Sequence, residues 1–270
     1  MIAAAVPLIN SELLAAARPS EKTGLALYTI RDAMAKDPGA ALAQASAIGY
    51  NWVEAADHKD RLFYSLKPTE FGKMVKKAGL ELLSTHSAIN TQNDDDMIED
   101  AATAGFRYLM LPSLPHEWSS SLDGYKRAAD FFNITGSKCK KAGLVFGFHN
   151  HQDEFREIDG KIPYDILVEN TDSRLVIFEL DLAWITAAGK DPVAYFKKYP
   201  GRFKVWHMKD LSPDKHDATL GEGIIDFKPI LAEARQAGMK YWFIEQDNCV
   251  SHSPMESITI SRNYYLNELR

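Results

Sequence analysis

The sequence has few cysteines, no excess of basic residues and no long apolar run. Its 270 residues include only Cys139 and Cys249, which lie far apart and fit no zinc-binding or redox spacing, although one disulfide stays possible. No window of about 18 uncharged apolar residues occurs, which argues against a membrane span. The formal net charge is −6, with 37 acidic and 31 basic residues, so no nucleic-acid partner is indicated.

The composition is that of an ordinary globular protein, with 46% hydrophobic and 25% charged residues. The length allows one or two domains, and single α/β barrels typically have about 250 residues. From Gly24 onward a short apolar, β-rich run, a polar loop and a helical stretch repeat along the chain. The predicted strands are Leu25–Ile30, Trp52–Ala56, Glu81–Thr85, Tyr108–Leu111, Leu144–Phe148, Leu175–Leu180, Phe203–His207 and Tyr241–Glu245.

Helical patterns lie between these strands and after the last one. The predicted helices are Ala40–Ile48, Pro68–Lys77, Asp95–Ala104, Leu122–Lys141, Tyr164–Asn170, Pro192–Tyr199, Phe227–Ala237 and Pro254–Leu269. Eight strands that alternate with helices predict parallel pairing with right-handed crossovers. No GxGxxG turn follows the first strand, which weakens a dinucleotide-binding interpretation. The pattern therefore predicts an α/β protein with a single (β/α)8 TIM barrel.

The first 23 residues precede this repeat and form a predicted N-terminal extension, with the barrel over residues 24–270. Met1 to Ala17 is apolar and alanine-rich, and its only charge is Glu12. One interpretation is the rear half of an export signal, which would place the protein in the periplasm. The other is a short helix packed on the outside or bottom of the barrel of a cytoplasmic protein.

Polar residues occur where the predicted strands end. Catalytic groups of a TIM barrel come from the C-terminal ends of the strands and the loops that follow. Strands 5 to 8 supply one candidate metal ligand each, namely His149, Asp181, His207 and Glu245. Adjacent strands are about 4.8 Å apart, so these side chains can converge on one point. The structural alternative is that each is an isolated polar residue above the barrel core.

We expect these four side chains to bind one divalent ion. Mixed imidazole and carboxylate ligands suit Mn²⁺, Zn²⁺, Co²⁺ or Fe²⁺ better than Ca²⁺, and Mg²⁺ also stays a candidate. Glu179 shares a strand face with Asp181 but lies one layer deeper, where it could support a neighbouring ligand. Lys209 could hold a substrate oxygen, or it could form a surface ion pair with Asp210.

Other residues near the strand ends are candidates for catalysis or substrate binding. Glu245 and His151 are candidates for proton transfer, with Glu154 and Lys209 as further catalytic candidates. Glu54 and His86, which follow strands 2 and 3, are candidates for substrate binding. The predicted apolar walls for a sugar are Trp184, Trp206 and Phe148, although an aromatic side chain beside a barrel strand often only packs.

Five segments, in this order, resemble the xylose-isomerase-like sugar isomerase/epimerase superfamily. They are HNHQDEF (149–155), ELDLAWITAAGKDP (179–192), GRFKVWHMKD (201–210), GEGIIDF (221–227) and WFIEQDN (242–248). The resemblance implies a TIM barrel with one divalent metal, and Asp181, His207 and Glu245 match three of its usual ligands. His149 stands where sugar epimerases of this superfamily have a glutamate. The HNH-type loop resembles the branch that includes inosose dehydratase and lyases of 3-keto sugars.

The resemblance implies enolisation, in which a proton next to a sugar carbonyl is removed through an enediolate. Isomerisation, epimerisation and elimination share this step, and the missing strand-5 glutamate puts simple epimerase chemistry in doubt. A metal ion acts here as a Lewis acid, and a positioned base typically contributes 10²–10⁴-fold. The expected partner is a small sugar or sugar derivative, and a homo-oligomer is possible.

Two other functions compete with this interpretation. A nuclease of the endonuclease IV type shares the barrel, but it needs three metals and a DNA-binding surface, which the acidic charge does not favour. A non-catalytic sugar-binding barrel would keep the metal only as a docking point.

Overall fold

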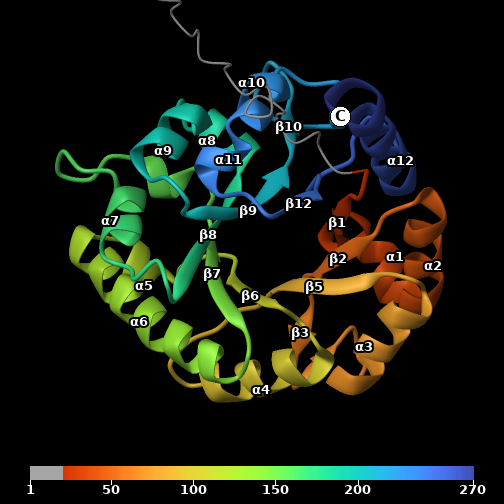
Figure 1. The fold of residues 1–270 in the computed structure, drawn as a ribbon, viewed down its shortest axis with the longest axis horizontal. Coiled ribbons are helices and arrows are strands. Elements are labelled where there is room, and N and C mark those ends of the chain that lie inside the picture. The colour runs from red at the N-terminus through yellow and green to blue at the C-terminus, as the bar shows by residue number, and fades with distance from the viewer. Residues whose placement is uncertain (1–20) are drawn as a thin grey trace, which may run out of the picture.

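Eight parallel strands close into a barrel that a ring of helices surrounds (Figure 1). The structure is a computed structural model that describes residues 21–270. The barrel strands are β1 (Gly24–Ala26), β2 (Trp52–Ala55), β5 (Glu81–His86), β6 (Tyr108–Leu111), β7 (Val145–His149), β8 (Val176–Asp181), β9 (Phe203–Met208) and β12 (Tyr241–Ile244). Strand β1 pairs with β12, with Leu25 opposite Ile244, and this pairing closes the ring. The predicted (β/α)8 barrel is confirmed.

The eight predicted helical stretches are present with small changes at their ends, and three short helices, Arg31–Lys36, His116–Ser119 and Leu182–Ala187, are additions that the sequence pattern does not predict. The helices are α1 (Arg31–Lys36), α2 (Pro38–Ile48), α3 (Pro68–Lys77), α4 (Asp94–Ala104), α5 (His116–Ser119), α6 (Leu122–Lys141), α7 (Pro163–Glu169), α8 (Leu182–Ala187), α9 (Pro192–Lys198), α10 (Phe227–Ala232), α11 (Ala234–Ala237) and α12 (Pro254–Tyr264). The stretch predicted as one helix over 227–237 divides at Glu233, and α12 continues as a π-helix over Tyr265–Leu269.

The first predicted strand is wrong in its second half. Strand β1 ends at Ala26, and Leu27–Ile30 forms a 3-10 helix. The hydroxyl of Thr29 in this turn accepts a hydrogen bond from the backbone N–H of Gln246, at 2.9 Å. The turn is therefore tied to the end of β12, and Tyr28 projects at the rim with 41% of its surface exposed.

Apolar side chains fill both the space around the barrel and its lower interior. The interior cluster consists of Ala26, Trp52, Leu83, Tyr108, Met110, Ile177, Val205 and Phe243. The indole of Trp52 donates a hydrogen bond to the carbonyl of Trp242 across Gly24, at 3.0 Å. A Cβ atom on Gly24 would lie 2.2 Å from that indole, so only glycine allows this packing.

Two short hairpins extend the loops at the strand ends. They are β3 (His58–Lys59) with β4 (Leu62–Phe63), and β10 (Asp210–Leu211) with β11 (Asp217–Ala218). In residues 21–270 no helix is long and apolar enough to cross a membrane. Both interpretations of Met1 to Ala17 concern residues outside the described part of the chain.

Candidate functional site

A pocket of about 600 Å³ opens among the loops that follow the barrel strands. Its lining residues are Tyr28, Ala56, Asp57, His58, His86, Ser87, Ala88, Pro112, His149, His151, Trp184, Glu245, Asp247 and Asn248. Five of the residues selected from the sequence, His86, His149, His151, Trp184 and Glu245, therefore face one cavity. Its size is typical of a small-molecule site.

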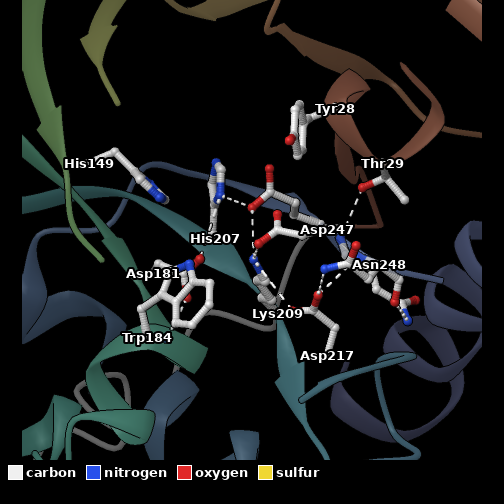
Figure 2. Close-up of polar contacts among 12 residues, drawn as sticks. Tyr28, Thr29, His149, Asp181, Trp184, His207, Lys209, Asp217, Asp247 and Asn248 are labelled. Atoms are coloured by element: carbon white, nitrogen blue, oxygen red, sulfur yellow. Dashed lines mark hydrogen bonds and ion pairs between the residues drawn. The ribbon is translucent and has the colours of Figure 1, made fainter. Parts of the chain in front are cut away.

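His207 lies at the centre of the charged groups beneath this pocket (Figure 2). Its Nδ1 is 2.8 Å from Oε2 of Glu245, and its Nε2 is 2.7 Å from Oε2 of Glu54. Burial alone would lower the pKa of His207, but the carboxylates of Glu245, Glu179 and Glu54 outweigh it and hold that pKa well above its usual value. The two ring nitrogens thus face two different groups of carboxylates.

Asp181 combines a structural contact with a free ligand atom. Its Oδ1 accepts a hydrogen bond from the backbone N–H of Trp184 at 2.8 Å and so caps α8. Its Oδ2 is buried, has no hydrogen-bond partner among the described residues, and lies 3.9 Å from Nδ1 of His207. Burial raises the pKa of Asp181 to about 7. A buried carboxylate oxygen of this kind is costly unless something binds it.

The ligand atoms of Asp181, His207 and Glu245 all lie within 4.8 Å of one another. Two carboxylates and one imidazole are donors that Zn²⁺ and similar divalent ions accept in proteins. The unpartnered oxygen of Asp181 is the atom that such an ion would satisfy. The residues present therefore fit the metal that the sequence predicts, and three of the four expected ligands come together.

His149 belongs to a second, deeper group in this structure. Its ligand atom gathers with those of His86, Glu179 and His207, and its Nδ1 is 3.4 Å from Oε2 of Glu179. Glu179 is fully buried and also lies 2.6 Å from Nε2 of His86. Glu179 therefore supports neighbouring histidines from the deeper layer, as expected. The role of His149 as the fourth ligand stays a prediction.

Glu54 occupies a different place from the one expected. It is 1% exposed and lies outside the pocket lining, with Oε2 between Nε2 of His207 and Nε2 of His86, at 2.7 Å and 3.2 Å. The reason is its position in the barrel interior, two residues beyond Trp52 on the same face of β2. Glu54 therefore holds the two histidines, while His86 reaches the cavity wall.

Lys209 is enclosed by acidic groups rather than paired with Asp210. Its ammonium contacts Asp247 and lies 3.6 Å from Glu245 and 3.7 Å from Asp217, and it sits 4.7 Å from the centre of the Trp184 ring (Figure 2). These carboxylates raise its pKa although burial lowers it. The alternative prediction, a surface ion pair between Lys209 and Asp210, is therefore wrong.

Asp210 instead organises the loop that follows β9. Its carboxylate accepts hydrogen bonds from the backbone N–H groups of Leu211, Gly221, Gly223 and Ile225, at 2.9 to 3.1 Å. A Cβ atom on Gly223 would lie 2.3 Å from this carboxylate. The GEGIIDF segment thus closes around Asp210 and helps to place the hairpin that carries Asp217.

The loop after β7 places His151 in the pocket and turns Glu154 away from the ligands. Glu154 is buried, and its Oε2 accepts a hydrogen bond from the backbone N–H of His151 at 2.7 Å. Burial, with the nearby charge of Lys209, lowers the pKa of His151 to about 4. His151 is therefore neutral near pH 7 and can accept a proton, whereas Glu154 shapes the loop.

Two of the three predicted aromatic walls only pack. Trp206 is fully buried and stacks on Phe196 with ring centres 4.9 Å apart, and Phe148 packs on Phe132. Both precede a polar strand-end residue by one position, so they face the helices rather than the interior. Trp184 lines the pocket as expected.

Some residues of the site were missed from the sequence. The side-chain oxygen of Asn150 accepts a hydrogen bond from the backbone N–H of Asp181 at 3.1 Å, and Asp217 accepts two from Asn248. Asn150 stands between two candidate histidines, which was a usable signal. Asp217 lies in a polar loop that looks solvated, and nothing in its spacing indicates the contact.

Comparison with known proteins assigns this barrel to a family. A sequence model described as the xylose isomerase-like TIM barrel matches residues 42–257. The chain belongs to this family. Inosose dehydratase of Geobacillus kaustophilus is 31% identical over 157 residues, which cover 50% of this chain and 48% of that protein. The chain thus spans about half the length of the curated relatives it matches.

Solved structures share this barrel over nearly the whole chain. A sugar phosphate isomerase/epimerase from Parabacteroides distasonis is 25% identical, with a TM-score of 0.81 over 96% of this chain and 99% of that one. An IOLI protein solved with bound zinc is 14% identical, with a TM-score of 0.70 over 91% and 97% of the two chains, and this likeness shows the fold alone. The predicted resemblance to the superfamily, and to inosose dehydratases within it, is confirmed.

Proposed function

We propose that the protein is a metal-dependent enzyme that removes a proton next to the carbonyl of a keto sugar. The observation that carries this proposal is the convergence of Asp181, His207 and Glu245 at the pocket floor, with one carboxylate oxygen of Asp181 buried and unpartnered. His149, on the neighbouring strand, is the proposed fourth ligand. A divalent ion held there would polarise the sugar carbonyl as a Lewis acid.

The side chains around the ligands have separate roles in this reaction. Glu245 lines the pocket, and its pKa is well below the usual range because His207 and Lys209 outweigh the effect of burial. It is therefore ionised and available to accept the proton. His151 is neutral and lies on the same cavity, where it can take or return a proton on another face of the sugar. Trp184 forms an apolar wall.

Elimination is the favoured form of the reaction. The inosose dehydratases among the relatives carry out a dehydration according to their name, and about half of this chain aligns with them. In elimination the second group protonates a leaving hydroxyl rather than the sugar carbon. His151 lines the cavity and, as a neutral imidazole, can relay a proton to the leaving hydroxyl by donating its N–H while its other ring nitrogen accepts one, so that water leaves. His149 stands where epimerases of the superfamily have their second glutamate. Isomerisation and epimerisation are the alternatives.

Exchange of hydrogen in D₂O tests the proposal. The metal-loaded protein is incubated with ketoses, an inosose and a 3-keto glycoside, and deuterium is measured at the carbon next to the carbonyl. We expect exchange or loss of water with at least one substrate. Glu245→Gln should lower that rate by about 10²–10⁴-fold, the usual contribution of a positioned base. Its metal content must be measured alongside, because Glu245 is also a proposed ligand.

The matched control is Glu81→Gln, which makes the same change at an exposed glutamate at the N-terminal end of β5. It should leave exchange unchanged. If the wild type with full metal content exchanges no proton with any of these sugars, proton abstraction is contradicted. Sugar binding without turnover would then favour the non-catalytic barrel.

A further inference from the structure

We infer that the natural substrate is an uncharged sugar that carries no phosphate group. This inference rests on the proposed function and names its substrate class. It separates this chain from enzymes that bind sugar phosphates, which use cationic side chains or free backbone N–H groups to hold a dianion. The charges on the pocket wall, the contacts of Lys209 and the capped helix ends support it.

The pocket wall carries three carboxylates and four histidines but no permanently charged cation among the described residues. Among the described residues that line it, Asp57, Glu245 and Asp247 carry carboxylates, and no lysine or arginine is present. Carboxylates accept hydrogen bonds from hydroxyl groups, which suits a polyhydroxylated ligand. A divalent ion would offset the charges of Asp181 and Glu245, and Asp57 would remain as an exposed carboxylate on the wall. A phosphate dianion would meet repulsion there.

The loops where TIM barrels frequently hold a phosphate are occupied by acidic groups in this chain. That place is formed by the loops after the seventh and eighth barrel strands, here β9 and β12. Lys209 follows β9, but its side chain is 1% exposed and its ammonium is held by Asp247, Glu245 and Asp217 (Figure 2). Asn248 in turn donates to Asp217 from its backbone and its side chain, at 2.9 and 3.0 Å. The cation therefore serves internal carboxylates.

The N-termini of helices α10 and α12 are also capped by side chains of this chain. At α12, Ser253 and Glu256 form a reciprocal capping box, with Glu256 accepting from the backbone of Ser253 at 2.9 Å. At α10, Asp226 accepts from the backbone of Lys228 at 3.1 Å. These carboxylates take the position that a bound phosphate would occupy at a helix end.

Arg31, which lies close to the rim, also uses its guanidinium for contacts within the protein. Its Nη1 donates to the carbonyls of Tyr28 and Asp247, at 3.0 and 2.8 Å, and its guanidinium lies 4.5 Å from the centre of the Tyr28 ring. Arg31 thus braces the 3-10 turn against the loop after β12. Tyr28 instead presents an exposed aromatic surface at the pocket edge, which suits the apolar face of a sugar ring.

Paired substrates test the inference. The metal-loaded wild type is compared on D-fructose and D-fructose 6-phosphate, and on D-ribulose and D-ribulose 5-phosphate, with an inosose as a further uncharged substrate. The measurements are deuterium exchange and calorimetric binding. A dianion about 6 Å from one carboxylate is disfavoured about tenfold even at the dielectric constant of water, so we expect at least that preference for uncharged sugars.

Asp247→Asn should narrow this preference, because it removes a carboxylate from the pocket and releases Lys209. The matched control is Asp130→Asn, which removes an exposed carboxylate on α6 and should leave the preference unchanged. If a phosphate ester is exchanged as fast as its sugar or faster, the inference is overturned while proton abstraction stands. If no sugar and no ester exchanges hydrogen, the proposed function fails, and the calorimetric affinities alone test the inference. Tighter binding of the uncharged sugars then supports the inference, and tighter binding of the esters overturns it.

Discussion

The lower and upper halves of the barrel interior differ sharply although the same strands build both. Residues two positions apart on one strand face the same interior, so each strand contributes to both layers. The lower and upper members are Trp52 and Glu54 on β2, Ile177 and Glu179 on β8, Val205 and His207 on β9, and Phe243 on β12 with Glu245 directly after that strand. An apolar layer thus changes into a charged one within a single alternation of each strand.

The two layers contribute to the free energy of folding with opposite sign. Burial of the apolar layer stabilises the barrel by roughly 1.5–3 kcal/mol for each large side chain. Burial of the charged layer costs hydration free energy, and hydrogen bonds within the protein offset this cost only partly. Three atoms, Asp181 Oδ2, Glu54 Oε1 and His149 Nδ1, are buried without hydrogen-bond partners among the described residues. A protein retains such groups for chemistry rather than for stability, so the upper layer is where function is expected.

The largest effect should come from Asp181→Ala, which removes a proposed ligand from the upper layer. We expect bound divalent metal, measured by elemental analysis of protein purified without chelator, to fall from about one ion per chain to nearly none. The substitution also removes the cap of α8 and should lower stability by about 0.5–2 kcal/mol.

A cap at another helix provides the matched control. Asp191 caps α9 by accepting from the backbone of Val193 at 2.9 Å, so Asp191→Ala should cost similar stability and keep the metal. Equal metal content in Asp181→Ala and the wild type would show that the unpartnered oxygen of Asp181 binds no ion. The lower and upper layers would then differ in polarity but not in metal binding.

The next effect concerns the lower layer. Leu83 is fully buried in the interior apolar cluster, so Leu83→Ala should lower the free energy of unfolding by about 2–5 kcal/mol in urea titrations. The metal affinity of the folded protein should not change. Ile134→Ala, at a side chain that is 58% exposed, is the control and should stay within about 0.5 kcal/mol of the wild type. Metal loss in folded Leu83→Ala would show that the layers are coupled.

Much of the fold was predictable because the chain repeats one strand–loop–helix unit, with proline and glycine residues that mark where helices begin and end. Helices α3 and α6 have the predicted bounds, since Pro68 marks one start and amphipathic spacing defines the other. The error at Leu27–Ile30 has a physical cause. A short apolar run can form a strand or a buried helical turn, and the contact from Thr29 to Gln246, distant in sequence, decides between them.

The site was predictable only where it follows strand order. Asp181, His207 and Glu245 end adjacent strands, so their proximity follows from topology. The contact between His207 and Glu54 crosses the barrel and joins residues 153 positions apart, which strand ends alone cannot indicate. The enclosure of Lys209 likewise depends on how two loops fold back, and local spacing suggested Asp210 instead.

The smallest of these effects should come from Glu54→Gln, which changes the support of a ligand and not the ligand itself. Oε2 of Glu54 lies 2.7 Å from Nε2 of His207 and can accept a hydrogen bond from it. That bond fixes the proton on Nε2 and leaves Nδ1, on the side of Asp181 and Glu245, free for a metal. Loss of such a support typically weakens metal affinity by about 10–100-fold, which chelator competition can measure.

Another buried carboxylate that pairs with a histidine supplies the control. Oδ2 of Asp100 lies 3.0 Å from Nε2 of His58, outside the ligand groups, so Asp100→Asn should disturb local stability and leave metal affinity unchanged. If both variants weaken metal binding equally, the effect reflects general loosening of the barrel. If only Glu54→Gln does so, the carboxylate that contacts His207 sets the affinity, because Asp100 pairs with a histidine that lies outside the ligand groups.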